Sequence, residues 1–390
     1  MTTVRRLFNF LASYGLSIIL LLLLMMLVFF GTLEQTRLGL YEAQRRYFES
    51  LIVVHPLFGR IPLPMPGGYL LLGLVFINML CGAIIKAPKR FSRPGLLIAH
   101  GGVIFLIAAA FVAHHYALSG NIPLFEGETG DRFQSYYDWE LRITETGEHS
   151  DGRQFIIPQE QLEVSRNGTG RVFFADALPF TLRVARYYAN CRPVPGHGPW
   201  SVDGVALESL ASSHTAEQNA PGLVAHIQAA DANDSGPWIG LLWAMERAPW
   251  RVTVDGRDYA LSLNRREWVL PFSLTLNRFN HETHPGTGIP SHFSSEITLT
   301  EGFAQREVVI RMNEPLRHRG YTFYQASWGP PDAPPGARLY SVLAVARNPA
   351  GQWPMYASCV ISLGLLMHFC QVLFRYLKRQ ARAKENCHEN

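Results

Sequence analysis

Two histidines stand inside apolar stretches of this chain, and their surroundings make both candidates for metal ligation or proton transfer. His100 lies in a run between Arg93 and Glu126 that contains no Asp, Glu, Lys or Arg. His368 lies in a second apolar run near the C-terminus. An imidazole in hydrocarbon is costly to desolvate, so it is by default a functional candidate. The alternative for His100 is a hydrogen bond to a neighbouring helix, and for His368 a place at the membrane interface.

The elements that must position these histidines are four apolar blocks, separated by segments of soluble composition. Each block is long enough to cross a membrane, because about 20 apolar residues span the hydrocarbon. The blocks cover residues 11–30, 69–85, about 96–113 and about 353–374. The sequence therefore predicts an integral membrane protein with four transmembrane α-helices.

Basic residues flank these blocks in a pattern that predicts the orientation of the chain. They cluster at Arg5 and Arg6, within residues 86–93 and within residues 375–384. The positive-inside rule puts all three clusters and both termini on the cytoplasmic side of the inner membrane, with residues 116–350 on the outer, periplasmic side. Basic residues in these positions contact anionic membrane lipid, so the net charge of +4 does not indicate nucleic-acid binding.

This topology brings His100 and His368 to matching depth. The third and fourth spans run in opposite directions, and each histidine falls about two turns from the cytoplasmic surface. Two imidazoles that approach from opposite sides are typical ligands of a haem iron. His100 and His368 are therefore candidate ligands of one haem iron, and a position at the membrane interface is the favoured alternative for His368.

The large outer segment shows alternating apolar and polar residues, which predict antiparallel β-strands in a sandwich or open barrel. Such patterns occur at residues 139–143, 180–184, 250–254, 272–276, 296–299 and 308–312. A short amphipathic helix is expected within residues 38–53, on the outer interface. The predicted organisation is a first span (1–30), an outer link (31–68), two further spans (69–115), a β-rich outer domain (116–350), and a fourth span with a basic tail (351–390).

Five further histidines have both a structural and a functional interpretation. His114 and His115 form either a polar belt at the end of the third span or a second, outer ligand site. His281, His284 and His292 are expected in a solvated loop, because an H-x-x-H pair without a third ligand is a weak metal signal. We therefore favour the polar belt and the solvated loop.

The tryptophans and cysteines of the outer segment are expected to be structural. Trp238, Trp243 and Trp250 are expected to pack within the strand domain rather than stack on a porphyrin. Of the five cysteines, only Cys191 falls in this segment, so no disulfide is expected within it. The sequence has no C-x-x-C or C-x-x-C-H, which excludes a thioredoxin-like reductase and a carrier of covalent haem.

Three stretches, in order along the chain, resemble the ResB/CcsB family of cytochrome c biogenesis proteins. Gly31-Thr-Leu-Glu-Gln35 is similar to the family's G-T-x-P-Q after the first span, with Glu34 in place of the proline. Leu97-Ile-Ala-His-Gly-Gly-Val103 resembles the span motif that contains a membrane histidine. Met312-Asn-Glu-Pro-Leu-Arg-His-Arg-Gly-Tyr-Thr-Phe-Tyr-Gln325 looks like the late strands of the outer domain. Residues from about 190 to 250 match the family least.

The resemblance implies a subunit of a System II cytochrome c synthase that helps to move haem b, without covalent attachment, to the outer face. It implies a partner, a CcsA/ResC-type membrane protein with a tryptophan-rich haem-binding segment, and apocytochrome c as the acceptor. His100 corresponds to the family's membrane haem ligand, and the catalytic residues are expected largely on the partner. The alternatives are a b-type haem anchor of an electron-transfer complex, with His100 and His368 on one haem, and a scaffold that binds no haem.

Overall fold

The structure is a computed structural model that describes residues 2–57, 60–86, 94–147, 152–163, 170–229, 237–283, 290–330, 334 and 337–388. The chain divides into two compact units, the first formed by Met1–Ala117 with Arg347–Asn390 and the second by Leu118–Ala346. Most of the basic cluster within residues 86–93, and His284, lie outside the described residues.

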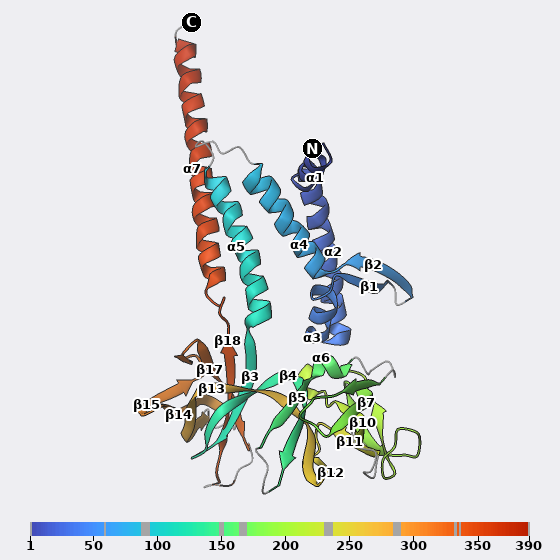
Figure 1. Cartoon of the computed structure of the whole chain (residues 1–390). Coiled ribbons are helices and arrows are strands. Elements are labelled where there is room, and N and C mark those ends of the chain that lie inside the picture. The colour runs from blue at the N-terminus through green and yellow to red at the C-terminus, as the bar shows by residue number, and fades with distance from the viewer. Residues whose placement is uncertain are drawn as a thin grey trace. The chain divides into compact units, whose positions relative to one another are not determined.

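Four apolar helices dominate the first unit and confirm the predicted membrane spans (Figure 1). Each is long and apolar enough to cross a membrane, and most of its residues are unburied, as expected where side chains contact lipid. Their bounds are α2 (Tyr14–Leu38), α4 (Gly68–Met79) continued by the π-helical η2 (Leu80–Ile85), α5 (Pro94–Tyr116) and α7 (Trp353–His388).

A short helix, α1 (Thr2–Leu11), precedes α2. Asn78 of α4 forms hydrogen bonds on both sides of the break between these two helices. The Asn78 amide nitrogen donates to the Leu11 carbonyl oxygen at 2.7 Å, and its amide oxygen accepts from the Ser17 hydroxyl at 2.7 Å. Ser13 caps α2 by accepting a hydrogen bond from the Leu16 amide. One buried amide thus ties the start of the first span to the second span.

The outer link is partly helical, as predicted, but it also contains a β-hairpin that the sequence pattern did not reveal. The helical part comprises α3 (Leu40–Ala43) and the π-helical η1 (Gln44–Phe48). The hairpin pairs β1 (Ile52–Leu57) with β2 (Ile61–Pro66) in antiparallel register. Its prolines are tolerated because a two-stranded ribbon leaves the outward side of each strand without hydrogen-bond partners.

Antiparallel strands build the second unit, which confirms the predicted β-rich domain and all six predicted strand segments. In the described part of this unit, short helices interrupt the strands: α6 (Gln159–Leu162) and the 3₁₀ turn η4 (Ala216–Gln218). The strands are β3 (Leu118–Phe125), β4 (Thr129–Thr146), β5 (Gln154–Pro158), β6 (Arg171–Phe173), β7 (Phe180–Tyr188), β8 (Cys191–Pro195), β9 (Val205–Ser209), β10 (Gly222–Ala229), β11 (Trp238–Trp243), β12 (Trp250–Val254), β13 (Arg257–Thr283), β14 (Pro290–Glu301), β15 (Ala304–Arg311), β16 (Leu316–His318), β17 (Tyr321–Gly329) and β18 (Tyr340–Arg347).

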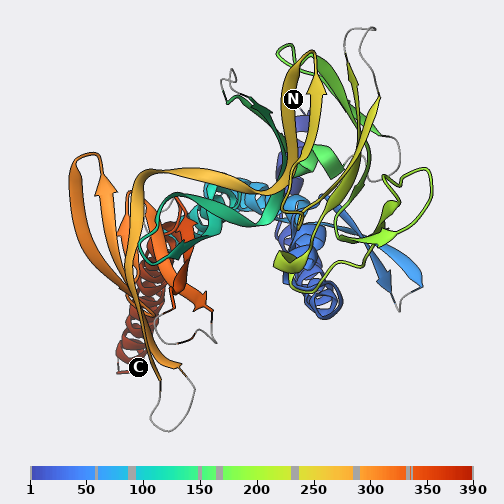
Figure 2. The same ribbon diagram turned by 90° about the horizontal axis from the view of Figure 1, so that it is seen from below.

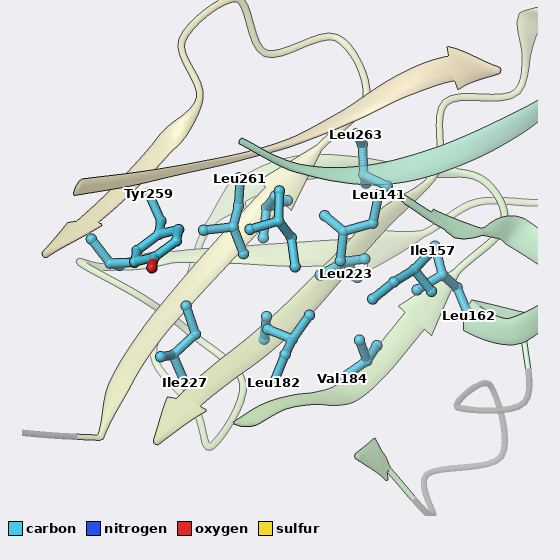
Figure 3. Close-up of a cluster of buried hydrophobic side chains, with 14 of the residues drawn as sticks. Leu141, Ile157, Leu162, Leu182, Val184, Leu223, Ile227, Tyr259, Leu261 and Leu263 are labelled. Carbon is cyan, nitrogen blue, oxygen red and sulfur yellow. The ribbon is translucent and has the colours of Figure 1, made fainter. Parts of the chain in front are cut away.

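The second unit has two lobes, and the long strands β4 and β13 run through both (Figure 2). The register between these strands shifts after Arg265 and again after Val269, and such irregularities bend a ribbon. One lobe adds the sheet β11-β10-β7-β6, and its core includes Leu141 and Leu261 of the long strands with Leu182 and Leu223 (Figure 3). The other lobe has its own core around Phe133, Leu274, Ile297 and Phe323.

Candidate functional site

Helices α5 and α7 pack antiparallel through small residues that bring their backbones into contact. A β-carbon on Gly95 would lie 2.5 Å from the His368 amide nitrogen, and one on Gly364 would lie 2.5 Å from the Ala99 amide nitrogen. Close approach of this kind is the usual role of small residues between membrane helices. No porphyrin therefore fits between α5 and α7 at this depth.

His368 lies on the side of α7 that packs against α5. Its amide is next to Gly95, and its Nδ1 is buried without a hydrogen-bond partner among the described residues. The side-chain oxygen Oε1 of Gln371, one turn further along α7, is also buried and has no hydrogen-bond partner among the described residues. The structure thus gives His368 neither a hydrogen bond nor an open face toward a large ligand on the α5 side.

His100 points away from α7. It follows Ala99, which faces α7, and consecutive residues are about 100° apart around a helix axis. Its Nδ1 lies 2.7 Å from the Leu96 carbonyl oxygen. Because a carbonyl only accepts, Nδ1 carries the ring proton and Nε2 keeps a free lone pair. A ligating histidine has this same arrangement, in which one ring nitrogen donates to a carbonyl and the other binds the metal.

The two predicted ligands are therefore not brought together. His368 lies beside Gly95, which is about 7.5 Å along the α5 axis from His100, and the two imidazoles face different sides of α5. Figure 1 shows α5 between α7 and α4, so the side of α5 that is turned away from α7 is the side toward α4. Each histidine stays a predicted ligand, but they do not form a pair on one haem within this chain.

The C-terminal end of α5 carries a second group of polar side chains. The Tyr69 hydroxyl of α4 lies 2.5 Å from Nε2 of His114, and a Glu49 carboxylate oxygen lies 3.7 Å from its Nδ1. The adjacent His115 has its Nδ1 3.0 Å from the Phe111 carbonyl oxygen. His114 thus links α5 to α4 and to the outer link, whereas His115 bonds only its own helix among the described residues.

The described histidines of the second unit do not form a metal site. His281 and His292 lie on β13 and β14 rather than in a loop, so the predicted solvated loop is wrong for these two, although both are exposed. The His281 ring stacks on Trp328 with centroids 4.6 Å apart. Among the described residues, no three His, Cys, Asp or Glu side chains gather around a possible metal position.

The tryptophans of this unit are packing residues, as expected. The Trp250 ring lies directly over Gly240, and the Trp243 indole nitrogen donates to the Cys191 carbonyl oxygen at 3.0 Å. Cys191 is a free thiol with 2% of its surface exposed. Burial raises its pKa to about 12, so this thiol is chemically inert at neutral pH.

Sequence reasoning missed a buried polar pair in the outer link. The Tyr47 hydroxyl lies 2.5 Å from Nδ1 of His55, and the His55 ring stacks on Phe30 with centroids 4.4 Å apart. Burial, and secondarily the Glu34 carboxylate, raise the pKa of Tyr47. Gly31 permits this packing, because a β-carbon there would lie 3.1 Å from the Phe48 ring. The outer link therefore packs against α2 at the G-T-x-x-Q segment, residues 31–35.

The chain is similar to one protein-family profile and to several known proteins. The ResB-like family profile matches residues 252–335, which include all of β13 to β17. Protein NrfI of Wolinella succinogenes is 20% identical over 318 residues, which are 81% of this chain and 31% of that protein. The cytochrome c biogenesis protein CcsB of Synechococcus sp. strain RCC307 is 41% identical over 58 residues, 14% of this chain and 13% of that protein. CcsB of Synechococcus sp. strain CC9902 is 33% identical over 96 residues, 23% of this chain and 22% of that protein. The chain therefore spans less than a third of the length of these relatives.

Proposed function

Because this chain belongs to the ResB/CcsB family, we propose that it is a membrane subunit of a cytochrome c haem-lyase complex. Its cargo is haem b, which passes to the outer face without covalent attachment to this chain. There it meets apocytochrome c for thioether attachment. The two relatives named CcsB are cytochrome c biogenesis proteins, and the proposal carries that role to this chain.

The observation that carries the proposal is the orientation of His100. Its Nδ1 proton is committed to the Leu96 carbonyl oxygen, so Nε2 is left as a neutral ligand with a free lone pair. The ring is held by its own helix and does not depend on a neighbouring helix for its hydrogen bond. In this tautomer Nε2 is the ring nitrogen that can bind haem iron.

The second iron ligand comes from another protein. Haem iron takes ligands from both faces of the porphyrin, whereas His368 lies in the α5–α7 contact on the other side of α5. A CcsA/ResC-type membrane partner supplies the opposite ligand and most of the catalytic residues. The partner then reaches His100 on the side of α5 turned away from α7, where α4 and η2 also contact α5, and the α5–α7 pair acts as a rigid support.

The second unit serves on the outer side, where it presents apocytochrome c to the haem. A protein in that position must not trap the cysteines of its client in mixed disulfides. Cys191, the one cysteine between residues 118 and 346, is buried and its raised pKa keeps it protonated. The unit can therefore hold a client with reduced thiols without reacting with it.

The test is haem retention by the full chain purified together with its membrane partner. We expect His100→Ala to remove most of the co-purified haem, while His197→Ala, which removes an exposed imidazole of the second unit, leaves it unchanged. Wild-type haem content in the His100→Ala complex would reject the ligand assignment. Loss of haem from the isolated chain in both His100→Ala and His368→Ala would favour the electron-transfer anchor, and a wild-type complex without haem would favour the scaffold.

A further inference from the structure

The β1–β2 hairpin has one face on which every side chain is apolar and none is buried. That face is made by three pairs of opposite residues: Ile52 with Pro66, Val54 with Pro64 and Pro56 with Pro62. Ile52 is 68% exposed and Val54 is 47% exposed. Arg60 is the one Lys, Arg, Asp or Glu between residues 51 and 68. The face therefore offers a partner neither a charge nor a side-chain hydrogen bond.

The opposite face of the hairpin packs on the membrane spans. Val53 and Met65 are buried in one apolar cluster with Leu27 of α2 and Leu71 of α4. Both leucines lie within helices that are apolar enough to cross a membrane, so the hairpin sits beside the end turns of these helices rather than beyond them. Figure 1 shows the hairpin projecting to the side of α2 and α4, which is along the plane of a membrane that they cross.

The open edges of the hairpin have few hydrogen-bond donors. Proline has no N–H, so the pairs that contain Pro62, Pro64 and Pro66 are the non-hydrogen-bonded ones, whose backbone groups point out of the ribbon. Four of these six outward positions are proline. The Val54 carbonyl oxygen, which also points outward, accepts from Nη2 of Arg46 at 3.0 Å. An open strand edge in contact with lipid is costly because its polar groups lack partners, and proline removes the donors among them.

We propose that the β1–β2 hairpin is a lipid-binding element that lies in the bilayer at the boundary between headgroups and acyl chains. Ile52, Val54 and the prolines contact acyl chains, while the edge carbonyl oxygens that remain stay close enough to the surface to meet water. Arg60, which is exposed at the turn of the hairpin, reaches the lipid phosphates. The element that rests on the membrane is thus a hairpin, in addition to the short helix expected in this link.

Lipid fits this face better than another protein chain does. A strand of a partner cannot extend the hairpin, because proline edges supply too few N–H donors for a new ladder. Protein interfaces are usually anchored by aromatic or arginine side chains, and the six residues of this face are isoleucine, valine and proline. The spans on which the hairpin packs are themselves largely unburied, so lipid that surrounds them also meets the hairpin. This inference is independent of haem and goes beyond the proposed function.

The test places a fluorophore on the hairpin of the full chain in lipid nanodiscs. In a chain whose native cysteines are replaced by alanine, Val54→Cys and, separately, Pro64→Cys on the opposite strand are labelled with nitrobenzoxadiazole. Ser212→Cys, an exposed position of the second unit, is the reference for water. A chain that keeps only Cys359, which is exposed on α7, is the reference for lipid. Quenching is measured with aqueous iodide and with a spin label carried by lipid near its headgroup, and circular dichroism checks that each labelled chain is folded.

We expect both hairpin labels to resemble the label on Cys359. The lipid-borne spin label should quench them at least about threefold more than the label on Ser212→Cys, and iodide should quench them less. Iodide quenching at either hairpin position as strong as that at Ser212→Cys would place the hairpin in water and overturn the proposal. Protection from both quenchers would mean that protein covers the face, and this result would overturn it as well.

Discussion

The backbone of α7 at Gly364 lies against the backbone of α5 at Ala99, because a β-carbon on Gly364 would come within 2.5 Å of the Ala99 amide nitrogen. This contact sets the rotation of α5 about its axis. With Ala99 facing α7, His100 must face away from it. The contact therefore keeps the His100 ring out of the α5–α7 interface.

Replacing Gly364 by valine should separate the two helices. The added side chain meets backbone atoms that cannot move aside, so we expect a loss of about 1–3 kcal/mol in the free energy of unfolding. Gly101→Ala is the matched control on α5, since nothing lies within 4 Å of the added β-carbon, and it should be neutral or slightly stabilising. Thermal denaturation of the chain in detergent measures both. A Gly364→Val chain as stable as the control would mean that α5 and α7 are not in contact.

The junction between the lobes of the second unit depends on a partly buried charge network. Arg142 contacts Glu140 at 2.7 Å and Glu267 at 3.2 Å, and its side chain is 16% exposed. Arg142→Met leaves two carboxylates without a cation in a poorly hydrated place, so we expect a loss of about 3–5 kcal/mol. Arg192→Met, which removes an exposed ion pair with Glu208, should cost less than about 1 kcal/mol. Chemical denaturation should separate the two variants, and equal stabilities would contradict the network's role.

The second unit should lose stability in mild acid through His226. Burial, and secondarily the Arg183 cation, lower the pKa of His226 below 6.5, and its Nε2 is buried without a partner among the described residues. The folded state thus holds a neutral imidazole, while the unfolded state takes up a proton as the pH falls below 6.5. The stabilisation is complete above that pH and is lost as the pH falls through the folded-state pKa. Melting temperatures between about pH 7.5 and 5.5 should fall less in His226→Gln than in wild type. The same fall in both would exclude His226 as the cause.

Cys191 should resist alkylation in the folded chain. The thiolate is the reactive form, and burial raises the pKa of this thiol to about 12. In a chain whose other cysteines are replaced by alanine, iodoacetamide at about pH 8 should modify Cys191 slowly, and denaturant should restore normal reactivity. Mass spectrometry gives the extent of modification. Rapid alkylation of the folded chain would contradict the inert role given to this residue in handling apocytochrome.

Much of this architecture could be predicted because apolar residues recur regularly along the chain. Four long apolar runs predicted the long helices of the first unit, and six segments of alternating apolar and polar residues predicted strands of the second. The β1–β2 hairpin was missed because Pro56, Pro62, Pro64 and Pro66 interrupt the usual strand composition. The two lobes were missed because β4 and β13 pass through both of them. The alternation of apolar and polar residues along a strand does not show where that strand leaves one lobe and enters the other.

Neither the relative depth nor the direction of the two candidate histidines could be predicted. The limits of the spans predicted matching depth for His100 and His368, but His368 lies beside Gly95, about 7.5 Å along the α5 axis from His100. Their rotation depends on the contact of Gly95 and Gly364 with the opposite helix, which is a tertiary feature. Neighbours such as His114 and His115 cannot be told apart from sequence, because their roles depend on which nitrogen meets Tyr69, Glu49 or a backbone carbonyl.

The central claim is that Nε2 of His100 binds haem iron while a partner supplies the opposite ligand. The most direct measurement is electron paramagnetic resonance of the oxidised haem in the complex, comparing wild type with His100→Gly. We expect a low-spin signal with two nitrogen ligands in wild type, and a high-spin, five-coordinate signal in any haem that the variant retains. An unchanged low-spin signal in His100→Gly would contradict the account.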